Sequence, residues 1–203
     1  MSSRLLVVGT LLGGIVLFAW QTVSHGLLGL PEKGMRVFPG DSAGVVAHNI
    51  RAAAPTNGVY FSRYGVLAAV DISGDFADKT KQFVPMMAKQ LALDLAIALV
   101  LTLLIGRLAS PSVVQTGLMY ALLALVFAGP VFLANGIWWN FPTEWNLGNV
   151  ADQVIGFFLL GLTLAALERR FAEPQIETAE RQGVRAPGGL GEVGRGQRVE
   201  GRG

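Results

Sequence analysis

Four long apolar runs, separated by more polar segments, dominate the pattern of hydrophobic positions along the chain. They cover about Leu5 to Val23, Leu91 to Leu108, Val113 to Ala134 and Leu147 to Leu167. An α-helix rises about 1.5 Å per residue, so roughly 20 apolar residues are needed to cross the hydrocarbon core of a bilayer. Each run is therefore long enough to form a transmembrane helix.

The first run also has features of a secretory signal peptide, because a single Arg4 precedes it. The run is longer than the apolar region of a typical signal peptide, however. The nearby triplets Thr22-Val23-Ser24 and Ser24-His25-Gly26 also differ from the preferred Ala-x-Ala cleavage site. We therefore expect residues 1–24 to be retained as the first transmembrane helix.

Residues 25–89 separate the first and second runs, and their mixed composition predicts a small extracytoplasmic α+β insert. Asp41 or Ser42 can cap a short helix that extends to about Ala53. An insert of this size cannot bury a large core of its own. We therefore expect it to lean on the membrane surface or on a partner.

Two segments of the insert predict a β-hairpin. Val59 to Phe61 and Val66 to Ile72 are rich in β-branched and aromatic residues, and a turn at residues 62–65 separates them. The insert should then lead helically into the second span. A break is expected at Pro85, because proline lacks the N–H that an interior helical turn uses.

The connections between the later spans are short. The polar residues 109–112 suit a tight turn, so the second and third spans should form an antiparallel helical hairpin. Gly129-Pro130 should bend the third span near its outer third. An aromatic loop from Gly136 to Trp145 then leads into the fourth span. Its tryptophans predict an interfacial belt at the membrane surface, formed by Trp138, Trp139 and Trp145.

Residues 169–203 are rich in glycine, arginine and glutamate and have no periodic apolar pattern, which predicts a disordered cytoplasmic tail. Residues 90–168 hold transmembrane helices 2–4. The sequence as a whole thus predicts a mainly α membrane protein. Its fold is a four-transmembrane-helix bundle with a small α+β extramembrane insert between helices 1 and 2.

The orientation of the spans follows from the arginines that flank them. Arg4 precedes the first span, Arg107 lies between the second and third, and Arg169 and Arg170 follow the fourth. With four spans, all of these positions fall on one side, and positive charges near span ends favour the cytoplasmic side. Both termini should therefore be cytoplasmic in a multi-pass membrane protein. The excess of arginine over lysine and the abundance of glycine and alanine fit a bacterial protein, so we expect a bacterial inner membrane.

Composition limits the function. With 52% hydrophobic residues, 15% charged residues and a net charge of +2, the chain has the lipid bilayer as its expected surroundings and no feature of a nucleic-acid-binding protein. The absence of cysteine excludes disulfides and thiolate metal sites. No nucleophile elbow, phosphate-binding glycine loop, HExxH zinc motif or dinucleotide fingerprint is present. We therefore expect no enzymatic activity and no cofactor.

Ionisable groups inside membrane spans are costly, so they are the strongest pointers to function in this chain. Asp94 and Asp152 each lie about one turn inside the outer end of a span, and Gln21 lies near the outer end of the first. We predict an outer polar layer to which every span contributes. Its candidate residues are His25, Asp94, Asn135, Asn149, Asp152 and Gln153.

Three interpretations of this layer stay open. Its members can hydrogen-bond one another and hold the bundle together. They can form a proton-responsive or ligand-binding pocket that opens to the outside. They can also supply a divalent-metal site from His25, Asp94 and Asp152, although no short ligand motif is present. Either aspartate can instead lie at the membrane interface, as a charge at the N-terminal end of its helix.

Small residues mark close helix packing in the first span. Gly9, Gly13 and Gly14 have the spacing that lets helix backbones approach closely. The contact they make is either internal to the bundle or part of a homodimer.

Three stretches of the chain resemble a loose group of small uncharacterised bacterial inner-membrane proteins. They are Phe18-Ala19-Trp20 through His25, Asn57-Gly58-Val59-Tyr60, and Ala151-Asp152-Gln153-Val154-Ile155-Gly156-Phe157. The resemblance implies a four-span architecture with an outer loop, and it implies no particular activity. Taken with the residues, it predicts a non-enzymatic accessory or interaction subunit of the cell envelope, bound to a membrane-protein partner. The alternative is a small proton- or ion-responsive transporter or sensor that uses the outer polar layer.

Overall fold

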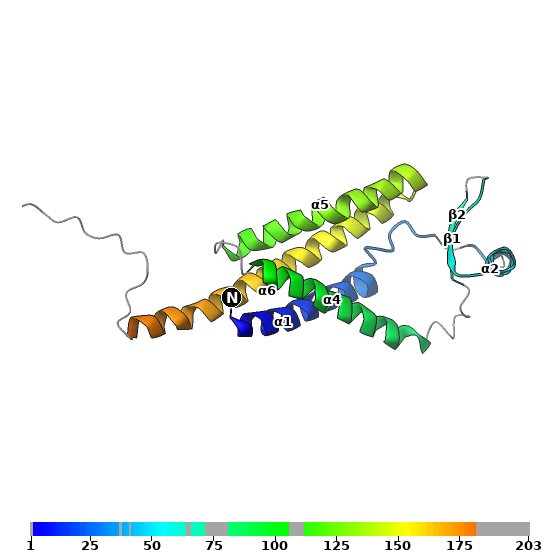
Figure 1. Ribbon diagram of the computed structural model, residues 1–203. Helices are drawn as coiled ribbons and strands as arrows, with labels where there is room; N and C mark the ends of the chain where they lie inside the picture. Colours follow the sequence, from blue (N-terminus) through cyan, green and yellow to red (C-terminus); the bar gives the residue numbers. More distant parts are fainter. Residues whose placement is uncertain are drawn as a thin grey trace, which may run out of the picture.

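Four long apolar helices and one two-stranded sheet make up the fold of the computed structural model (Figure 1). The structure describes residues 2–36, 38–40, 42–63, 66–71, 81–105 and 112–181, with side chains described as far as residue 171. The elements are α1 (Ser3–Val23), the π-helical turn η1 (Ser24–Leu28), α2 (Ser42–Ala53), β1 (Gly58–Phe61), β2 (Leu67–Val70), α4 (Phe83–Ile105), α5 (Val113–Trp139) and α6 (Thr143–Arg181).

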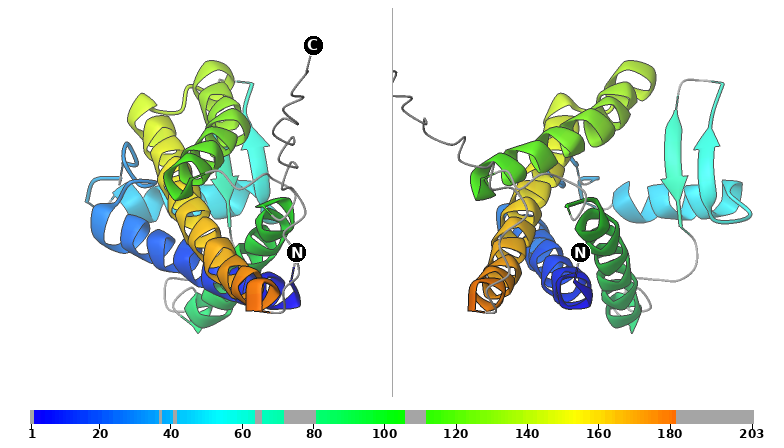
Figure 2. Two further views of the ribbon diagram at one scale, coloured as in Figure 1. Left: turned by 90° about the vertical axis from the view of Figure 1, so that its left-hand side faces the viewer. Right: turned by 60° about the vertical axis from the view of Figure 1, so that its left-hand side comes forward.

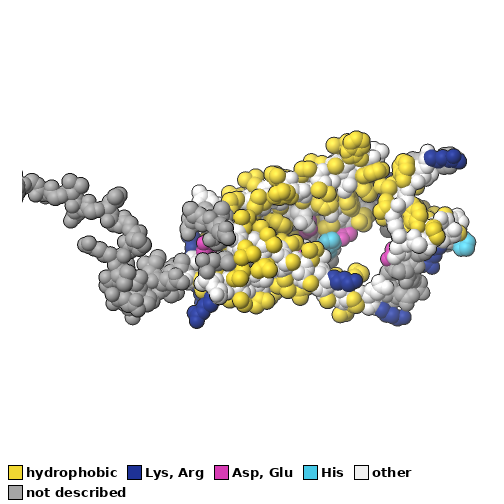
Figure 3. All heavy atoms as spheres, in the orientation of Figure 1, with side chains coloured by type: hydrophobic (Ala, Val, Ile, Leu, Met, Phe, Trp, Pro, Cys, Tyr) yellow, Lys and Arg dark blue, Asp and Glu magenta, His cyan; other side chains and the backbone are white. Residues whose placement is uncertain are grey.

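The predicted mainly helical fold with four long apolar helices is confirmed, and so is the small sheet. Each of the four helical segments Ser3–Leu28, Phe83–Ile105, Val113–Trp139 and Thr143–Phe171 is long and apolar enough to cross a membrane. Apolar side chains cover the long sides of the helices, and charged side chains lie towards the two ends and on the insert (Figure 3). The four helices are therefore compatible with a multi-pass membrane protein.

The helices pair differently from the sequence prediction. Helix α5 packs mainly along α6, whereas α4 packs mainly along α1, and α1 also contacts α6. Helices α4 and α5 run in opposite directions but diverge towards the end that carries the insert (Figures 1 and 2). The reason lies in the small residues. A Cβ atom on Gly161 would lie 2.9 Å from both Gly117 Cα and the Thr116 carbonyl oxygen, so α5 and α6 touch backbone to backbone.

The buried core lies where α1, α4, α5 and α6 meet. One hydrogen bond in it joins α5 to α4, because the hydroxyl of Tyr120 donates to the carbonyl oxygen of Leu101 at 2.8 Å. Tyr120 is fully buried, and its hydrogen bond satisfies the one polar group that its ring carries. The core consists of Leu17, Ala98, Leu101, Ile105, Tyr120, Leu160, Leu164 and Ala165.

The break expected at Pro85 lies just before the proline: Gln82 is a turn residue that interrupts the helical residues ahead of α4, and α4 then begins at Phe83 and continues through Pro85. Pro85 lies in the first turn, where a backbone N–H has no partner within the helix, so the missing donor costs nothing. Helix α5 likewise includes Pro130 and extends to Trp139.

The loop between α5 and α6 is much shorter than the aromatic loop predicted from the sequence. Only residues 140–142 separate α5 from α6, so two of the three tryptophans are helical at the end of α5 and the third lies at the start of α6. Asn140 ends α5 in the left-handed conformation (φ 54°), and its N–H donates to the Asn135 carbonyl. Asparagine tolerates this conformation better than most residues, which explains the abrupt turn.

The tryptophans make separate aromatic contacts. Trp145 stacks on Phe141 with ring centroids 4.8 Å apart and meets Phe132 edge to face at 5.7 Å. Trp139 meets Phe61 of β1 edge to face at 6.2 Å, which connects the insert to α5. Trp138 is exposed.

The insert contains the predicted helix and hairpin. Helix α2 spans Ser42–Ala53, and β1 pairs with β2 in antiparallel register, with Val59 opposite Ala69. No residue of α2 is buried. The insert lies at the end of the helical body opposite to the start of α1 (Figures 1 and 2).

Residues 29–34, which follow η1, pack on the start of α6. The Asn149 side chain donates an N–H to the Pro31 carbonyl at 3.1 Å. A Cβ atom on Gly148 would collide with the Leu30 carbonyl oxygen, so only glycine admits the segment at this point. We call residues 29–34 the strap.

Helix α6 extends beyond the predicted end of the fourth span. It continues to Arg181, whereas the sequence predicted a disordered tail from residue 169. Residues 168–181 include several glutamates, arginines and alanines, which have high helix propensity even without an apolar face. The rest of the predicted tail, residues 182–203, lies outside the described residues, as does Arg107.

Candidate functional site

Asp94 is fully buried in α4, with 0% of its surface exposed. Its Oδ1 accepts hydrogen bonds from the side-chain amides of Gln90, at 3.0 Å, and Gln21 of α1, at 3.3 Å. Gln90 reaches it because residues four apart lie on one face of a helix. The second carboxylate oxygen, Oδ2, is buried and has no hydrogen-bond partner.

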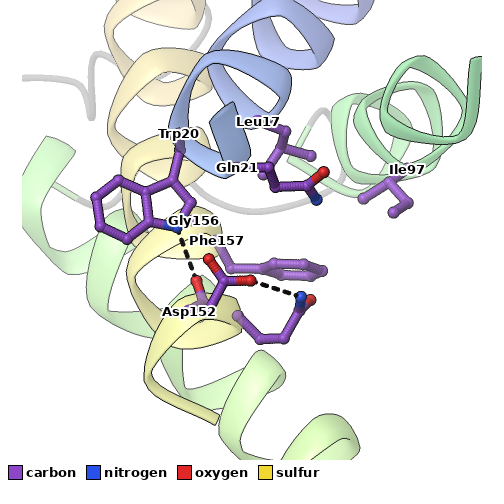
Figure 4. Close-up of a pocket in the computed structure, with 8 residues that line it drawn as sticks. Leu17, Trp20, Gln21, Ile97, Asp152, Gly156 and Phe157 are labelled. Atoms are coloured by element: carbon purple, nitrogen blue, oxygen red, sulfur yellow. Dashed lines mark hydrogen bonds between the residues drawn. The ribbon is translucent and has the colours of Figure 1, made fainter. Parts of the chain in front are cut away.

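Asp152 is also buried, in α6, with 3% of its surface exposed. Its Oδ2 accepts a hydrogen bond from the Gln153 side chain at 3.2 Å, and its Oδ1 is buried without a partner. Its main-chain carbonyl accepts the indole N–H of Trp20 at 3.0 Å (Figure 4). The indole fits here because Gly156 has no side chain, since a Cβ atom there would lie 2.9 Å from Trp20 Cδ1.

A small cavity lies beside Asp152 (Figure 4). Its volume is about 10 Å³, which is room for roughly one water molecule. Asp152, Gln153 and Gln21 supply its polar lining, together with the apolar Leu17, Ile97 and Phe157. Gln21 therefore contacts Asp94 with its amide and also lines the cavity that holds Asp152.

The electrostatics of this pair are unusual for a buried site. Among the described residues, no Lys, Arg or His forms an ion pair with Asp94 or Asp152. Burying an unpaired charge is costly, and buried carboxylates are ordinarily paired, protonated or bound to a cation. The two aspartates, with Gln21, Gln90 and Gln153, form what we call the carboxylate pair site.

A larger cleft of about 440 Å³ opens between α1 and α4 beside this site. Its walls are mainly apolar and include Phe18, Phe83, Met86 and Met87. Gln21 and Gln90 also line the cleft, and both donate to Asp94. The Asp94 carboxylate therefore lies behind these two glutamine side chains, which separate it from the cleft.

Other members of the predicted polar layer lie elsewhere. His25 lines the cleft, but its Nδ1 lies 2.6 Å from Glu32 Oε1, and its side chain is 52% exposed. Because it pairs with a nearby carboxylate of the insert, His25 is not a partner of either aspartate. Within the described part of the chain, no three His, Cys, Asp or Glu side chains come together as a metal site. The residues therefore do not form the divalent-metal site considered from the sequence.

The two asparagines of the predicted layer form hydrogen bonds with the strap and with the turn between α5 and α6. Asn149 donates to the carbonyls of Pro31 and Trp145, at 3.1 and 2.8 Å, and so holds the strap on α6. The main-chain carbonyl of Asn135 accepts the N–H groups of Asn140 and Phe141. In the described residues no hydrogen bond joins Asn135 to either aspartate. The single layer predicted from the sequence is therefore two separate sets of contacts.

Three functional neighbours were not named as layer members from the sequence. Gln90 precedes Asp94 by one helical turn, and this spacing was a usable signal. Trp20 reaches Asp152 across 132 positions, which no sequence spacing indicates. Asn146 is buried and donates to the Phe141 carbonyl at 3.2 Å, while its Oδ1 has no partner.

The glycines of α1 lie in contacts within this chain. A Cβ atom on Gly9 would lie 2.8 Å from the Thr102 side chain, one on Gly13 would lie 2.7 Å from Leu160, and one on Gly14 would lie 2.7 Å from Leu95. These glycines therefore bring α1 close to α4 and α6. No model of a known protein family, no characterised protein and no solved structure matches this chain.

Proposed function

We propose that the chain is a four-span protein of a bacterial inner membrane, with both termini in the cytoplasm. The length and apolar surface of α1, α4, α5 and α6 support four spans. Arg4 at the start of α1 and Arg169 and Arg170 late in α6 lie at the end opposite to the insert (Figure 1). Arginines at one end of the spans favour placing that end in the cytoplasm.

Within this membrane, the chain acts as a non-enzymatic accessory subunit that binds a membrane-protein partner through its insert. One observation carries this proposal: the described part of the insert exposes apolar side chains and buries few of its residues. Val45 of α2 is 62% exposed, and Val59 and Phe61 of β1 are 73% and 66% exposed. Because α2 buries no residue within the chain, a partner surface would stabilise the insert.

Native mass spectrometry of the protein released gently from its own membranes tests this role. We expect a stoichiometric protein partner that is lost in Val59→Asp, because an added charge on the exposed apolar face opposes docking. Ser3→Asp is the control, since it adds the same charge at an exposed position at the start of α1, away from the insert, and it should retain the partner. A wild-type protein released only as a free monomer would contradict the accessory role.

A second function is favoured by the carboxylate pair site. Asp94 Oδ2 and Asp152 Oδ1 are both buried without a hydrogen-bond partner, so each oxygen can accept a proton or interact with a cation. The chain would then be a small proton- or ion-responsive transporter or sensor. Thermal unfolding of the purified protein across pH and Na⁺ concentration tests it. Asp152→Asn should fold, and its melting temperature should no longer depend on pH or Na⁺ concentration. A variant whose melting temperature is lowered but still depends on pH or Na⁺ as in the wild type would count against this function.

A further inference from the structure

The cleft between α1 and α4 has the construction of a small-molecule site. Its volume of about 440 Å³ lies within the range of about 300 to 1,000 Å³ that is usual for ligand pockets. Such pockets combine mainly apolar walls with a few polar groups that fix the ligand. Here the two glutamines that line the cleft, Gln21 and Gln90, are also the two hydrogen-bond donors to Asp94.

The charge around the cleft selects the ligand. Among the described residues no Lys or Arg lines it, and His25, the basic residue in this lining, is paired with Glu32. The Asp94 carboxylate lies directly behind Gln21 and Gln90, is fully buried, and has one oxygen without a partner. A cation bound in the cleft would supply the positive charge that this buried carboxylate lacks, and so would stabilise its ionised form. The cleft is therefore complementary to a positive charge and opposes an anion.

The side chains that line the cleft favour a ligand with apolar groups. Phe18 and Phe83 offer aromatic faces, which attract cations, and Met86 and Met87 are flexible side chains that adapt to different apolar shapes. A bare inorganic ion would leave most of the cleft empty and would make no apolar contact with the methionines. An organic cation would place its charge towards Gln21 and Gln90 and its apolar groups against the phenylalanines and methionines.

We propose that the cleft between α1 and α4 binds lipophilic organic cations, such as quaternary ammonium or phosphonium compounds, with Asp94 as the counter-charge. This inference rests on the second candidate function and names the ligand class of that site. Asp94 attracts the ligand through the field at the cleft, and the two glutamine side chains can turn their amide oxygens towards the positive charge. Asp152 lies at the far side of Gln21 and is not required for contact with the ligand.

Equilibrium dialysis of the full chain in detergent, with empty micelles as the blank, tests the inference. The probe is tetraphenylphosphonium, and tetraphenylborate, an anion of the same shape, is its matched control. We expect saturable binding of the cation and none of the anion. Asp94→Asn should weaken binding of the cation by roughly 10- to 100-fold, which corresponds to the usual worth of an interaction with a charged group.

A second pair of variants keeps the test informative if Asp94→Asn does not fold. Met86→Trp should narrow the cleft and weaken binding while Asp94 stays in place, because Met86 lines the cleft, is 49% exposed and tolerates a larger side chain. Leu122→Trp makes a comparable enlargement on the exposed face of α5 and should bind normally. Equal binding of the cation and the anion would show a groove filled by any apolar molecule, and it would overturn the inference.

The outcomes also distinguish this inference from the proton- or ion-responsive function on which it rests. If the cation does not bind but wild-type stability responds to pH or Na⁺ in an Asp94-dependent way, the ligand class is wrong and the ion-responsive function stands. If neither response occurs, both proposals fail. If Asp94→Asn binds the cation as tightly as wild type, Asp94 is not the counter-charge and the inference is overturned.

Discussion

Gln21 and Asp94, which lie 73 positions apart in the sequence, are joined by a hydrogen bond of 3.3 Å between α1 and α4. The same glutamine lines both the small cavity beside Asp152 and the larger cleft between the two helices. Gln21 therefore lies between the cleft and both carboxylates, and Gln90 also lies between the cleft and Asp94. This position makes Gln21 the most informative residue for mutation.

We expect Gln21→Ala to destabilise the folded protein by about 1 to 3 kcal/mol, because the buried Asp94 carboxylate would lose one of its two donors. The measurement is the apparent free energy of unfolding in detergent. Thr22→Ala is the control on the same helix, since its hydroxyl donates only to the Phe18 carbonyl at an exposed position. Equal effects of the two substitutions would show that the bond to Asp94 contributes nothing.

Gly161→Ala should destabilise the pairing of α5 with α6 by about 1 to 3 kcal/mol, the usual cost of overpacking. The added methyl would lie 2.9 Å from the backbone of α5, which cannot move as a side chain can. Gly129→Ala is the control, because the nearest atom to its new methyl is Leu125 Cδ1 at 3.6 Å, an ordinary contact. Thermal unfolding of both variants decides the matter, and a wild-type melting temperature for Gly161→Ala would refute this packing.

The strap predicts a local effect of Gly148→Ala. The new methyl would collide with the Leu30 carbonyl, so the strap should leave α6 and lose its bond to Asn149. Limited trypsin digestion measures this directly, because the strap contains the exposed Lys33 and should be cleaved faster at that site. Gly26→Ala is the control, with no atom within 4 Å of its new methyl. An unchanged cleavage rate in Gly148→Ala would show that the strap does not depend on this contact.

The absence of cysteine allows a direct test of topology. A single cysteine at Val59, which is 73% exposed in the insert, should react with a membrane-impermeant maleimide added outside intact cells. A cysteine at Arg170, which is exposed at the other end of the molecule, should react only after the membrane is opened. The opposite labelling pattern would invert the proposed orientation.

Much of the fold could be predicted because it depends on local pattern. The four apolar runs correspond to α1, α4, α5 and α6, and the β-branched segments correspond to β1 and β2. Helix boundaries were less accurate. The proline in the first turn of α4 and the left-handed Asn140 after α5 have consequences that depend on where the helix begins or ends. The length of the aromatic loop was overestimated for this reason.

The candidate site could be predicted only in part. Asp94 and Asp152 were recognisable as carboxylates within apolar runs, and both are buried. Their partners come from three helices, and the bond from Trp20 to Asp152 spans 132 positions. His25 was assigned to the same layer because of its depth along α1. Its position beside Glu32 follows from the path of the chain after η1, which hydrophobic pattern does not reveal.

The sequence by itself determined how many long apolar helices form and where the insert lies, because apolar length and alternation are properties of neighbouring residues. Only the tertiary structure decided which helices pair, which polar groups are buried together and where a cleft opens. Apolar helices gain little from one another by hydrophobicity in lipid, so shape and hydrogen bonding select their partners. The close approach of Gly117 to Gly161 and the bond from Gln21 to Asp94 are such selections, and both depend on residues that meet only in three dimensions.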